Sequence, residues 1–554
     1  MSKRRLIRAA AFVLPFALAG CPRPEPKIQQ GQPVPRTFGN VVNLAQGWTE
    51  EQQERYWFTS QGSRILPMKW FLALEQASGS DLFRSDAHLD QLGFLLEKPS
   101  PKNPDGLPVG FAGDMDTSGE VWMGWTCAAC HTNQIHYQET AMRVDGAPAL
   151  IDVWSFLSEL NAALQKTADD DEKFDRFAGK VLGTGHDPRQ AEVLRQDLRK
   201  RAAFLAGWLR GNQSPYPYGY GRIDAFGFIF NQALGTYLGL PGNMQPADAP
   251  VSFPFLWDAP YADQVQWNGS FANAEPAGPL PRNIGEVLGV FAHLSVDPSQ
   301  GDHGYESSVN IENLGKIEES LTKLESPVWP SKVLPAIDPR RAEEGKEIYR
   351  AECASCHTLI DRTSPHREFK VTMTLISEVK TDPAMARNYL LRCGRTGRLE
   401  GVKVHILAGS KFGASAFAKD VLINQVLGIM LRQKGPTSDA MVEDFVNVGF
   451  PQHFALMSYK ARPLNGIWAT APYLHNGSVP NLWELLLPED QRSRSFQVGS
   501  RDYDPVHVGF QTQGSPGGFA FDTTLPGNSN AGHTFGTQLT DDQKWALIEY
   551  LKSL

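Results

Sequence analysis

Two pentapeptides of the form Cys-x-x-Cys-His constrain what this chain can fold into more than any other feature. They stand at 127–131 and 353–357 and use four of the six cysteines among 554 residues. In such a motif the two thiols form thioether bonds to a haem, and the adjacent histidine binds its iron. We therefore expect two covalent c-type haems. The predicted haem-binding residues are Cys127, Cys130 and His131 for the first haem, and Cys353, Cys356 and His357 for the second.

Two other uses of a Cys-x-x-Cys pair fit the sequence less well. A four-thiolate zinc site would have to unite Cys127 and Cys130 with the cysteines of the distant second motif. A thioredoxin-like dithiol needs a strand before the motif and a helix N-terminus at its first cysteine, which Trp125-Thr126 indicates only faintly. Zinc and a dithiol are therefore kept as alternatives to haem attachment. Cys393 is left over, and we expect it to be a buried, unreactive thiol.

The N-terminus has the pattern of a targeting segment. Four basic residues precede an apolar run from Ala9 to Leu18, which is too short to span a bilayer and ends in Leu18-Ala19-Gly20-Cys21. This small-small-Cys ending resembles the bacterial lipobox, so we expect a signal peptide over 1–20, lipid on Cys21 and a Pro-rich tether over 21–40. The alternative is an ordinary signal peptide with an unrelated cysteine. The first interpretation predicts a cell-envelope lipoprotein, anchored to a membrane by its lipid and facing the periplasm or on the outer membrane.

Composition indicates a globular protein with long ordered loops. Hydrophobic residues make up 41% of the chain, and 50 glycines and 39 prolines exceed average usage. The formal net charge of −8 becomes more negative once a basic signal peptide is removed. Nucleic acid is therefore not an expected partner, because binding to phosphates needs a positive surface.

The C-terminal part is the clearest domain. Asp338-Pro339 can start a helix that leads into the second motif, and Thr540-Asp541 can cap a final helix with a buried apolar face. In c-type cytochromes the first and last helices cross, and Gly345 would let them approach where Tyr550 packs. We therefore expect a cytochrome c-like domain over 335–554.

The N-terminal domain is expected over 41–334, enlarged and less regular. It holds the first motif, an amphipathic segment over 151–164 and long loops, and it ends near the Pro-rich run at 326–330. The predicted fold class is mainly α, with two cytochrome c-like haem domains and long loop insertions.

The sixth iron ligand decides what each haem can do. For the second haem we expect His533, because the loop before the last helix crosses the distal face of a c-type haem. The alternatives are His475 as the ligand, or His533 as a solvated loop residue. For the first haem no comparably placed Met or His stands out, which indicates an open iron that could bind O₂ or H₂O₂.

At 464–478 the sequence LNGIWATAPYLHNGS resembles the second-haem domain of bacterial di-haem cytochrome c peroxidases and their relatives. Further segments make the chain similar to the rubber oxygenase-like branch of that superfamily. These segments are Gln61-Gly62-Ser63, Leu66-Pro67, Trp70 to Glu75, Gly106 to Phe111, Arg143 to Ala149, Arg282 to Glu286, and Gly532-His533.

The resemblance implies a helical protein with one haem in each of two domains. In the rubber oxygenase-like branch the first haem is reactive and open, and the second is six-coordinate, with histidine at the position of His533 where the peroxidases usually have methionine. Related peroxidases hold a calcium ion between the domains, which makes calcium a further cofactor to test. The rubber oxygenases are secreted, so a lipid-tethered relative is poorly placed to attack polyisoprene.

Three classes of function follow. A dioxygenase would hold O₂ against an alkene in an apolar pocket, for which Trp257, Trp267 and Phe271 are candidate walls, although ordinary packing also explains them. A peroxidase needs an acid/base near the distal oxygen, and Glu286 is the first candidate, with a structural salt bridge as the alternative. A pure electron carrier would have both irons six-coordinate. Either enzyme would also need a redox partner protein or a small electron donor.

Overall fold

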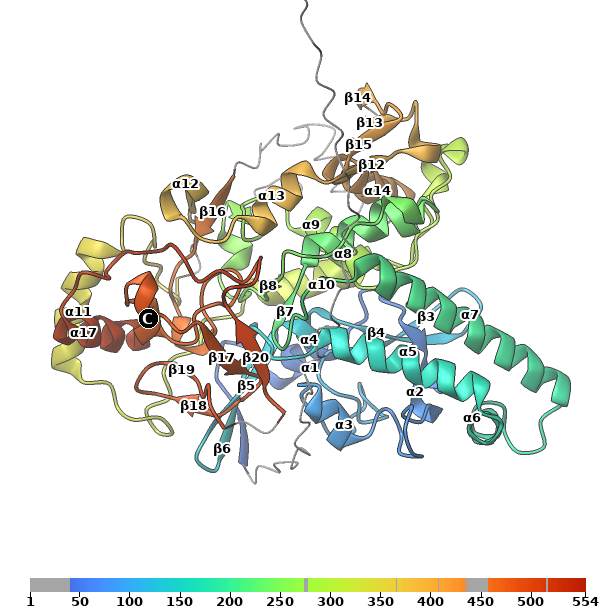
Figure 1. The fold of residues 1–554 in the computed structure, drawn as a ribbon, viewed down its shortest axis with the longest axis horizontal. Coiled ribbons are helices and arrows are strands. Elements are labelled where there is room, and N and C mark those ends of the chain that lie inside the picture. The colour runs from blue at the N-terminus through green and yellow to red at the C-terminus, as the bar shows by residue number, and fades with distance from the viewer. Residues whose placement is uncertain are drawn as a thin grey trace, which may run out of the picture.

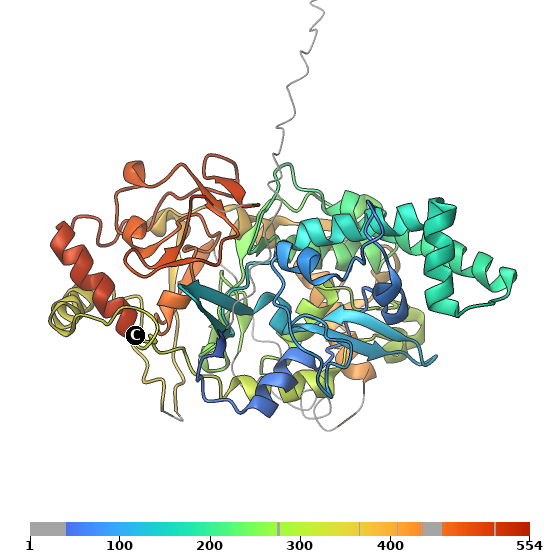
Figure 2. The same ribbon diagram turned by 90° about the horizontal axis from the view of Figure 1, so that it is seen from below.

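The computed structural model describes residues 40–554, apart from 274–277, 365, 407, 434, 436–456 and 515–516. The expected signal peptide and Cys21 therefore lie outside the described residues, as does nearly all of the expected tether. Figures 1 and 2 show an elongated arrangement in which the helices between residues 153 and 212 lie at one end and the last helix at the other. Within the described ranges, no helix is both long enough and apolar enough to cross a membrane.

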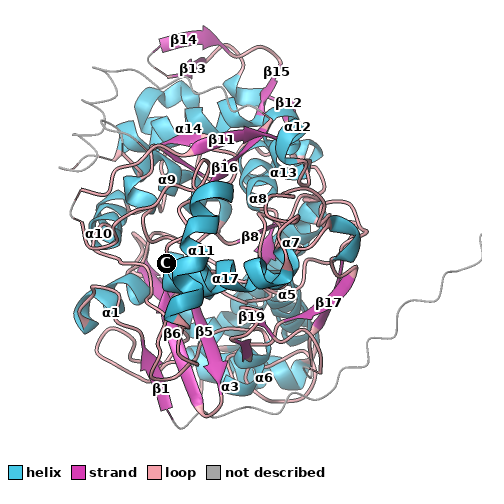
Figure 3. Cartoon of the chain, turned by 90° about the vertical axis from the view of Figure 1, so that its left-hand side faces the viewer, coloured by secondary structure: helices cyan, strands magenta, loops and turns pink. Residues whose placement is uncertain are grey.

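The expectation of a mainly α fold is wrong. The structure is 40% helix and 17% strand, so it is a mixed α/β fold. Its described strands form many small sheets of two or three strands each (Figure 3). The physical reason is that the long insertions between helices pair with each other as short ribbons. Many of these strands have only two to four residues, which is too short for an alternating pattern to be visible in the sequence.

Two three-stranded sheets flank the first motif. Strand β4 ends before Thr126, which caps the short helix α4 (Cys127–Cys130), and β5 begins immediately after the motif, so α4 is fixed at both ends. The first sheet has the order β2 (Leu66–Pro67), β4 (Val121–Trp125), β3 (Phe111–Met115), and the second has the order β1 (Asn40–Asn43), β6 (Thr140–Asp145), β5 (Thr132–Tyr137).

The amphipathic segment expected over 151–164 is confirmed as part of helix α5 (Val153–Asp169). Asp152 caps it by accepting a hydrogen bond from the Ser155 N–H, and its buried face includes Phe156, Leu160 and Leu164. The other helices of the N-terminal part are α1 (Glu50–Phe58), α2 (Met68–Ala73), α3 (Asp86–Gln91), α6 (Asp171–Leu182), α7 (Pro188–Asn212), α8 (Ala225–Asn231), α9 (Leu280–Gly289) and α10 (Ile311–Leu321).

Residues from the two halves of the chain share buried cores. Helix α14 (Ala418–Arg432) contributes Leu422 and Val426 to the same cluster as Ile284 and Leu288 of α9.

The remaining helices are α12 (Ile376–Val379), α13 (Ala384–Leu391) and α16 (Leu482–Leu485). The remaining strand pairs are β7 (Arg222–Ile223) with β8 (Val251–Ser252), β9 (Gln264–Val265) with β10 (Phe271–Ala272), β11 (Thr372–Leu375) with β16 (Ser458–Ala461), β12 (Cys393–Arg395) with β15 (Ser415–Phe417), β13 (Lys403–His405) with β14 (Ala408–Lys411), β17 (Ser495–Val498) with β20 (Phe519–Asp522), and β18 (Tyr503–Asp504) with β19 (Gly509–Phe510).

The expected pair of crossing helices is confirmed. Helix α11 (Pro339–Glu352) packs on α17 (Asp541–Ser553), and the rings of Tyr349 and Tyr550 lie 5.3 Å apart (Figure 3). At the crossing a Cβ on Gly345 would lie 1.9 Å from the Ala546 carbonyl oxygen, so only glycine allows this approach.

The expectation of a buried Cys393 is wrong, because this thiol is exposed on β12.

Replacing Gly345 with alanine should therefore destabilise the protein. The added methyl group meets backbone, which cannot rotate away, and overpacking of this kind costs about 1–3 kcal/mol in the free energy of unfolding. Thermal denaturation should show a lower Tm. Gly179→Ala in α6 is the matched control: it has open space at the Cβ position and should be neutral or slightly stabilising, because alanine favours helix. Equal behaviour of the two variants would contradict the proposed crossing.

Candidate haem sites

Each Cys-x-x-Cys-His motif lines its own cavity. The first cavity contains Cys127, Cys130 and His131 in its wall and encloses about 1340 Å³, including the part open to solvent. The second contains Cys353, Cys356 and His357 and encloses about 1430 Å³ on the same measure. Most of the side chains that line each cavity are apolar, as in pockets that bind organic cofactors. The lining of both cavities therefore suits a largely apolar cofactor such as haem.

His131 is held in the form that can bind a metal. Its Nδ1 lies 2.7 Å from the Pro254 carbonyl oxygen. Because a carbonyl can only accept, Nδ1 carries the proton and the lone pair of Nε2 is left for a ligand bond. Burial lowers the pKa of His131 to about 4, so the ring stays neutral at physiological pH. The donor set therefore fits an axial histidine.

His357 has the same arrangement, built from a different segment. Its Nδ1 donates to the Arg462 carbonyl oxygen at 2.6 Å, and burial lowers its pKa. The backbone of each motif is also held by a tyrosine in the same way. Tyr56 donates to the His131 carbonyl oxygen at 2.9 Å, and Tyr349 donates to the His357 carbonyl oxygen at 2.8 Å. The two motifs thus share their supporting hydrogen bonds although their flanking sequences differ.

A buried carboxylate anchors the helix that supports the first motif. Asp145, within the Arg143–Ala149 segment, accepts hydrogen bonds from Trp57 Nε1 at 2.6 Å and Gln53 Nε2 at 2.5 Å. Both donors lie on α1, which also carries Tyr56. Burial raises the pKa of Asp145, and these donors act against that rise by stabilising its charge. Asp145 therefore holds α1 in place, and α1 in turn contacts the motif through Tyr56.

His533 lies opposite His357 in the second cavity. Their ring centres are 6.3 Å apart, and both rings line the cavity. Two imidazoles that share one metal ion, with bonds of about 2 Å each, have ring centres about 6 Å apart. Burial lowers the pKa of His533 to about 4, so it is also neutral. The geometry therefore fits an iron bound between these two histidines.

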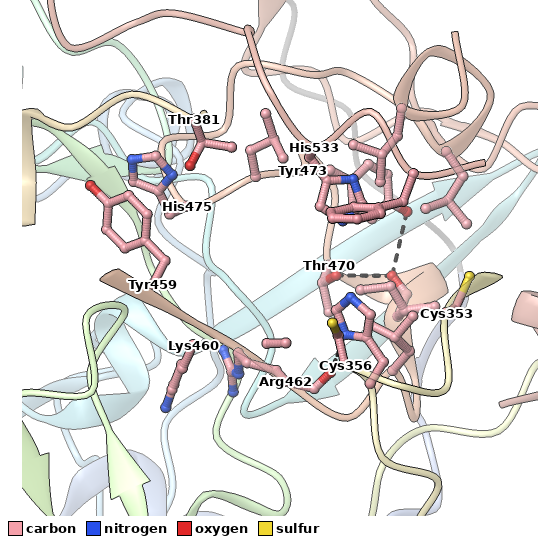
Figure 4. A pocket seen from close by; sticks show the side chains of 18 of the residues that line it. Cys353, Cys356, Thr381, Tyr459, Lys460, Arg462, Thr470, Tyr473, His475 and His533 are labelled. Atoms are coloured by element: carbon pink, nitrogen blue, oxygen red, sulfur yellow. Dashed lines mark hydrogen bonds between the residues drawn. The ribbon is translucent and has the colours of Figure 1, made fainter. Parts of the chain in front are cut away.

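His475 lies elsewhere on the wall of the second cavity. Its ring stacks on Tyr459, with centres 4.1 Å apart, and it is hydrogen-bonded to the backbone of Asp382. Figure 4 shows His475 beside Tyr459 on one side, and His533 with the two cysteines on the other. This placement favours His533 over His475 as the sixth ligand.

The first cavity differs from the second in its polar lining. Among the described residues of its wall, none is a histidine other than His131. Met385 is the one methionine described there, and the wall also holds several charged groups. These groups are Arg282, Glu286, Glu318, Lys460 and Arg462. The first iron position therefore has no counterpart of His533 within the described wall.

Glu286, on α9, lines the first cavity, and one of its two carboxylate oxygens is hydrogen-bonded. Gln266 Nε2 donates to its Oε1 at 2.7 Å, and its side chain is 43% exposed. Arg282 lies 3.8 Å from Glu286 but binds Glu318 at 2.6 Å, so its main ion pair is with Glu318. The surrounding protein desolvates the carboxyl group even though part of the side chain is exposed, and this raises the pKa of Glu286. These contacts favour the acid/base interpretation over a structural salt bridge.

Of the three aromatic residues considered as pocket walls, only Trp267 lines a cavity, and it lines both. Trp257 is fully buried and stacked on Phe255, and Phe271 lies in β10 away from both walls. The supporting roles of Pro254, Arg462, Tyr56 and Tyr349 are not predicted from the sequence. The role of Tyr349 could have been predicted from its position one helical turn before Cys353. Pro254 and Arg462 have no such signal in the sequence, because they accept through backbone oxygens that every residue type provides.

Calcium stays a prediction. Within the described ranges, no three or more His, Cys, Asp or Glu side chains gather in a group that could hold a metal ion.

Comparison with known proteins adds two findings. A family model described as RoxA-like, cytochrome c-like, matches residues 458–497, a segment that contains Arg462 and His475. The match supports the rubber oxygenase-like branch and indicates covalent haem c and a haem-based oxidoreductase. The chain is also similar to two proteins of Sinorhizobium fredii (strain NBRC 101917 / NGR234). These are "Uncharacterized protein y4iJ", 34% identical over 577 residues covering 93% of each chain, and "Uncharacterized protein y4iM", 28% identical over 334 residues covering 56% of this chain and 66% of the relative.

Replacing His533 with alanine should open the second site to added ligands, because the ring facing His357 is lost. The reduced variant should bind carbon monoxide at one more haem than the unmodified protein, measured from the absorption spectrum. His475→Ala is the matched control, since it removes a buried ring from the same cavity, and it should leave ligand binding unchanged. The reverse result would identify His475 as the ligand.

Proposed function

This chain belongs to the same family as protein y4iJ of Sinorhizobium fredii, and from the RoxA-like match at 458–497 and the difference between its two cavities we propose that it is an exported oxidoreductase with two covalent haems. In this proposal the first haem activates O₂ or H₂O₂ and the second transfers electrons. One observation carries the division of labour. The second cavity places His533 across from His357, whereas the described wall of the first cavity offers no second histidine.

The haem, when bound, supplies the iron redox chemistry, and the residues supply position and charge. His131 is kept neutral by burial and oriented by the Pro254 carbonyl, so it would offer Nε2 to the iron. The apolar wall, which includes Phe226, Ile229 and Val265, excludes water from the reacting side. Glu286 keeps Oε1 bonded to Gln266, which leaves Oε2 to take and return a proton.

The second cavity is suited to electron entry. His357 and His533 would close both faces of its iron, which keeps the coordination unchanged between oxidation states. Phe535 lines this cavity and is 45% exposed, so the cavity reaches the surface there. A redox partner protein or a small electron donor would approach at this edge. Lipid attachment at Cys21 would hold the protein on a membrane of the cell envelope, where c-type haem is attached in bacteria.

Two spectra test the proposal on the purified full-length protein. A pyridine haemochrome assay should give two haems per chain, and reduced protein should bind carbon monoxide at one of them. Binding of neither carbon monoxide nor cyanide would instead identify a non-catalytic electron carrier. If one haem binds carbon monoxide, turnover with H₂O₂ and an electron donor, compared with O₂ and an isoprenoid, decides between peroxidase and dioxygenase.

Glu286→Gln should slow the reaction with H₂O₂ by about 10²–10⁴-fold, the usual contribution of a positioned acid/base. The rate of the unmodified protein should rise with pH as Glu286 ionises, because only the carboxylate accepts a proton. That rise should lie above the ordinary range of a glutamate, since burial raises the pKa of Glu286. The variant should lose this pH dependence and keep both haem spectra.

Glu319→Gln on α10 is the matched control, because this side chain is 69% exposed and pairs with Lys323 on the surface. It should leave the rate unchanged. A Glu286→Gln protein with the rate and pH profile of the unmodified protein would exclude Glu286 as the acid/base.

A further inference from the structure

The two cavities share a wall. Lys460 and Arg462 line both cavities, as do Phe253, Phe255, Trp267 and Ser252. Lys460 is in β16 and Arg462 follows its last residue, so their side chains lie on the same side of an extended segment. Figure 4 shows both side chains together at one edge of the second cavity. The wall between the sites is therefore aromatic and carries the charge of Arg462, whereas burial lowers the pKa of Lys460 well below its usual range.

Arg462 connects the two motif histidines through this wall. Its backbone oxygen accepts the hydrogen bond of His357 Nδ1 at 2.6 Å. Its guanidinium lies 3.4 Å from the centre of the Phe255 ring, and its Nη2 donates to the Phe255 carbonyl oxygen. The residue before Phe255 is Pro254, whose carbonyl oxygen accepts from His131 Nδ1 at 2.7 Å. A single side chain therefore fixes the segment that orients one histidine, and its own backbone orients the other.

Asp258 acts on the Arg462 guanidinium only at longer range, because its own ion pair is with Arg367. Arg462 is 8% exposed, it makes no ion pair with any described carboxylate, and its Nη1 has no hydrogen-bond partner in the described part of the chain. Buried charges in proteins are normally paired, and an arginine nitrogen left open at a cofactor cavity is suited to a carboxylate of that cofactor. A haem carries two such carboxylates on its edge.

We propose that Arg462 is a positioning residue shared by both haem sites, whose backbone orients His357, whose side chain orients His131 through Phe255 and Pro254, and whose Nη1 binds a haem carboxylate. This inference rests on the proposed two-haem function. A positive charge between the sites favours the reduced state of each iron, so one residue would set the reduction potentials of both.

The test measures reduction potentials on the purified full-length holoprotein by spectroelectrochemical titration. Arg462→Met should shift both potentials to more negative values, because it removes the shared positive charge. Arg462→Lys, which keeps the charge, should restore both at least in part. The haem whose carboxylate binds Nη1 should also have a reduction potential that depends on pH, because that carboxylate titrates. In Arg462→Met this dependence should move to higher pH, because a carboxylate without its arginine has a higher pKa.

Arg201→Met is the matched control. Arg201 is also stacked on an aromatic ring, Phe204 at 4.8 Å, and donates to backbone carbonyls, but it lines neither cavity. It should leave both potentials unchanged. Should Arg462→Met not fold, Arg462→Gln keeps a donor for the Phe255 carbonyl without the charge and should give the same negative shifts.

The outcomes separate the two proposals. Fewer than two haems in the unmodified protein would overturn both the proposed function and this inference. Two haems with unmoved potentials in the Arg462 variants, or a shift at only one haem, would overturn the shared role of Arg462 alone.

Discussion

The hydrogen bond from each motif histidine to a backbone carbonyl is the interaction on which both sites depend. A Cys-x-x-Cys-His sequence brings the ring near a cofactor but does not fix its rotation or its tautomer. The carbonyl acceptors come from residues far away in sequence, Pro254 for His131 and Arg462 for His357. The mixed α/β scaffold of short ribbons has to place these two acceptors, because a carbonyl turned away from its histidine would leave the ring free to rotate.

The two sites share these supporting hydrogen bonds but differ in the side chains on the other side of each cavity. Tyr56 and Tyr349 hold the two motif backbones through equivalent hydrogen bonds, so the proximal sides are built alike. On the other side, the second cavity has His533, and the first has Glu286 with a raised pKa. A neutral imidazole suits a closed iron and a carboxyl of raised pKa suits proton transfer, so the difference between the sites follows from a few side chains.

The sequence predicts the parts of this structure that depend on local pattern or on a specific residue type. The α11–α17 crossing follows from helix caps and from Gly345, and the position of His533 opposite His357 follows from its place before the last helix. The fold class could not be predicted correctly, because strands of two to four residues have too little alternation to recognise. Pro254 and Arg462 could not be predicted either, since the atom that matters at each is a backbone oxygen positioned by tertiary structure.

The shared wall also explains why the two halves of the chain cannot be regarded as independent cytochromes. Phe255 and Trp267 come from the N-terminal half, and Arg462 comes from the C-terminal half, yet all three line both cavities. The guanidinium of Arg462 stacked on Phe255 keeps the halves in register at the point where the cavities adjoin. A change in the position of this wall would move the carbonyl acceptors of both His131 and His357. The orientation of His131 is therefore linked through this wall to the orientation of His357.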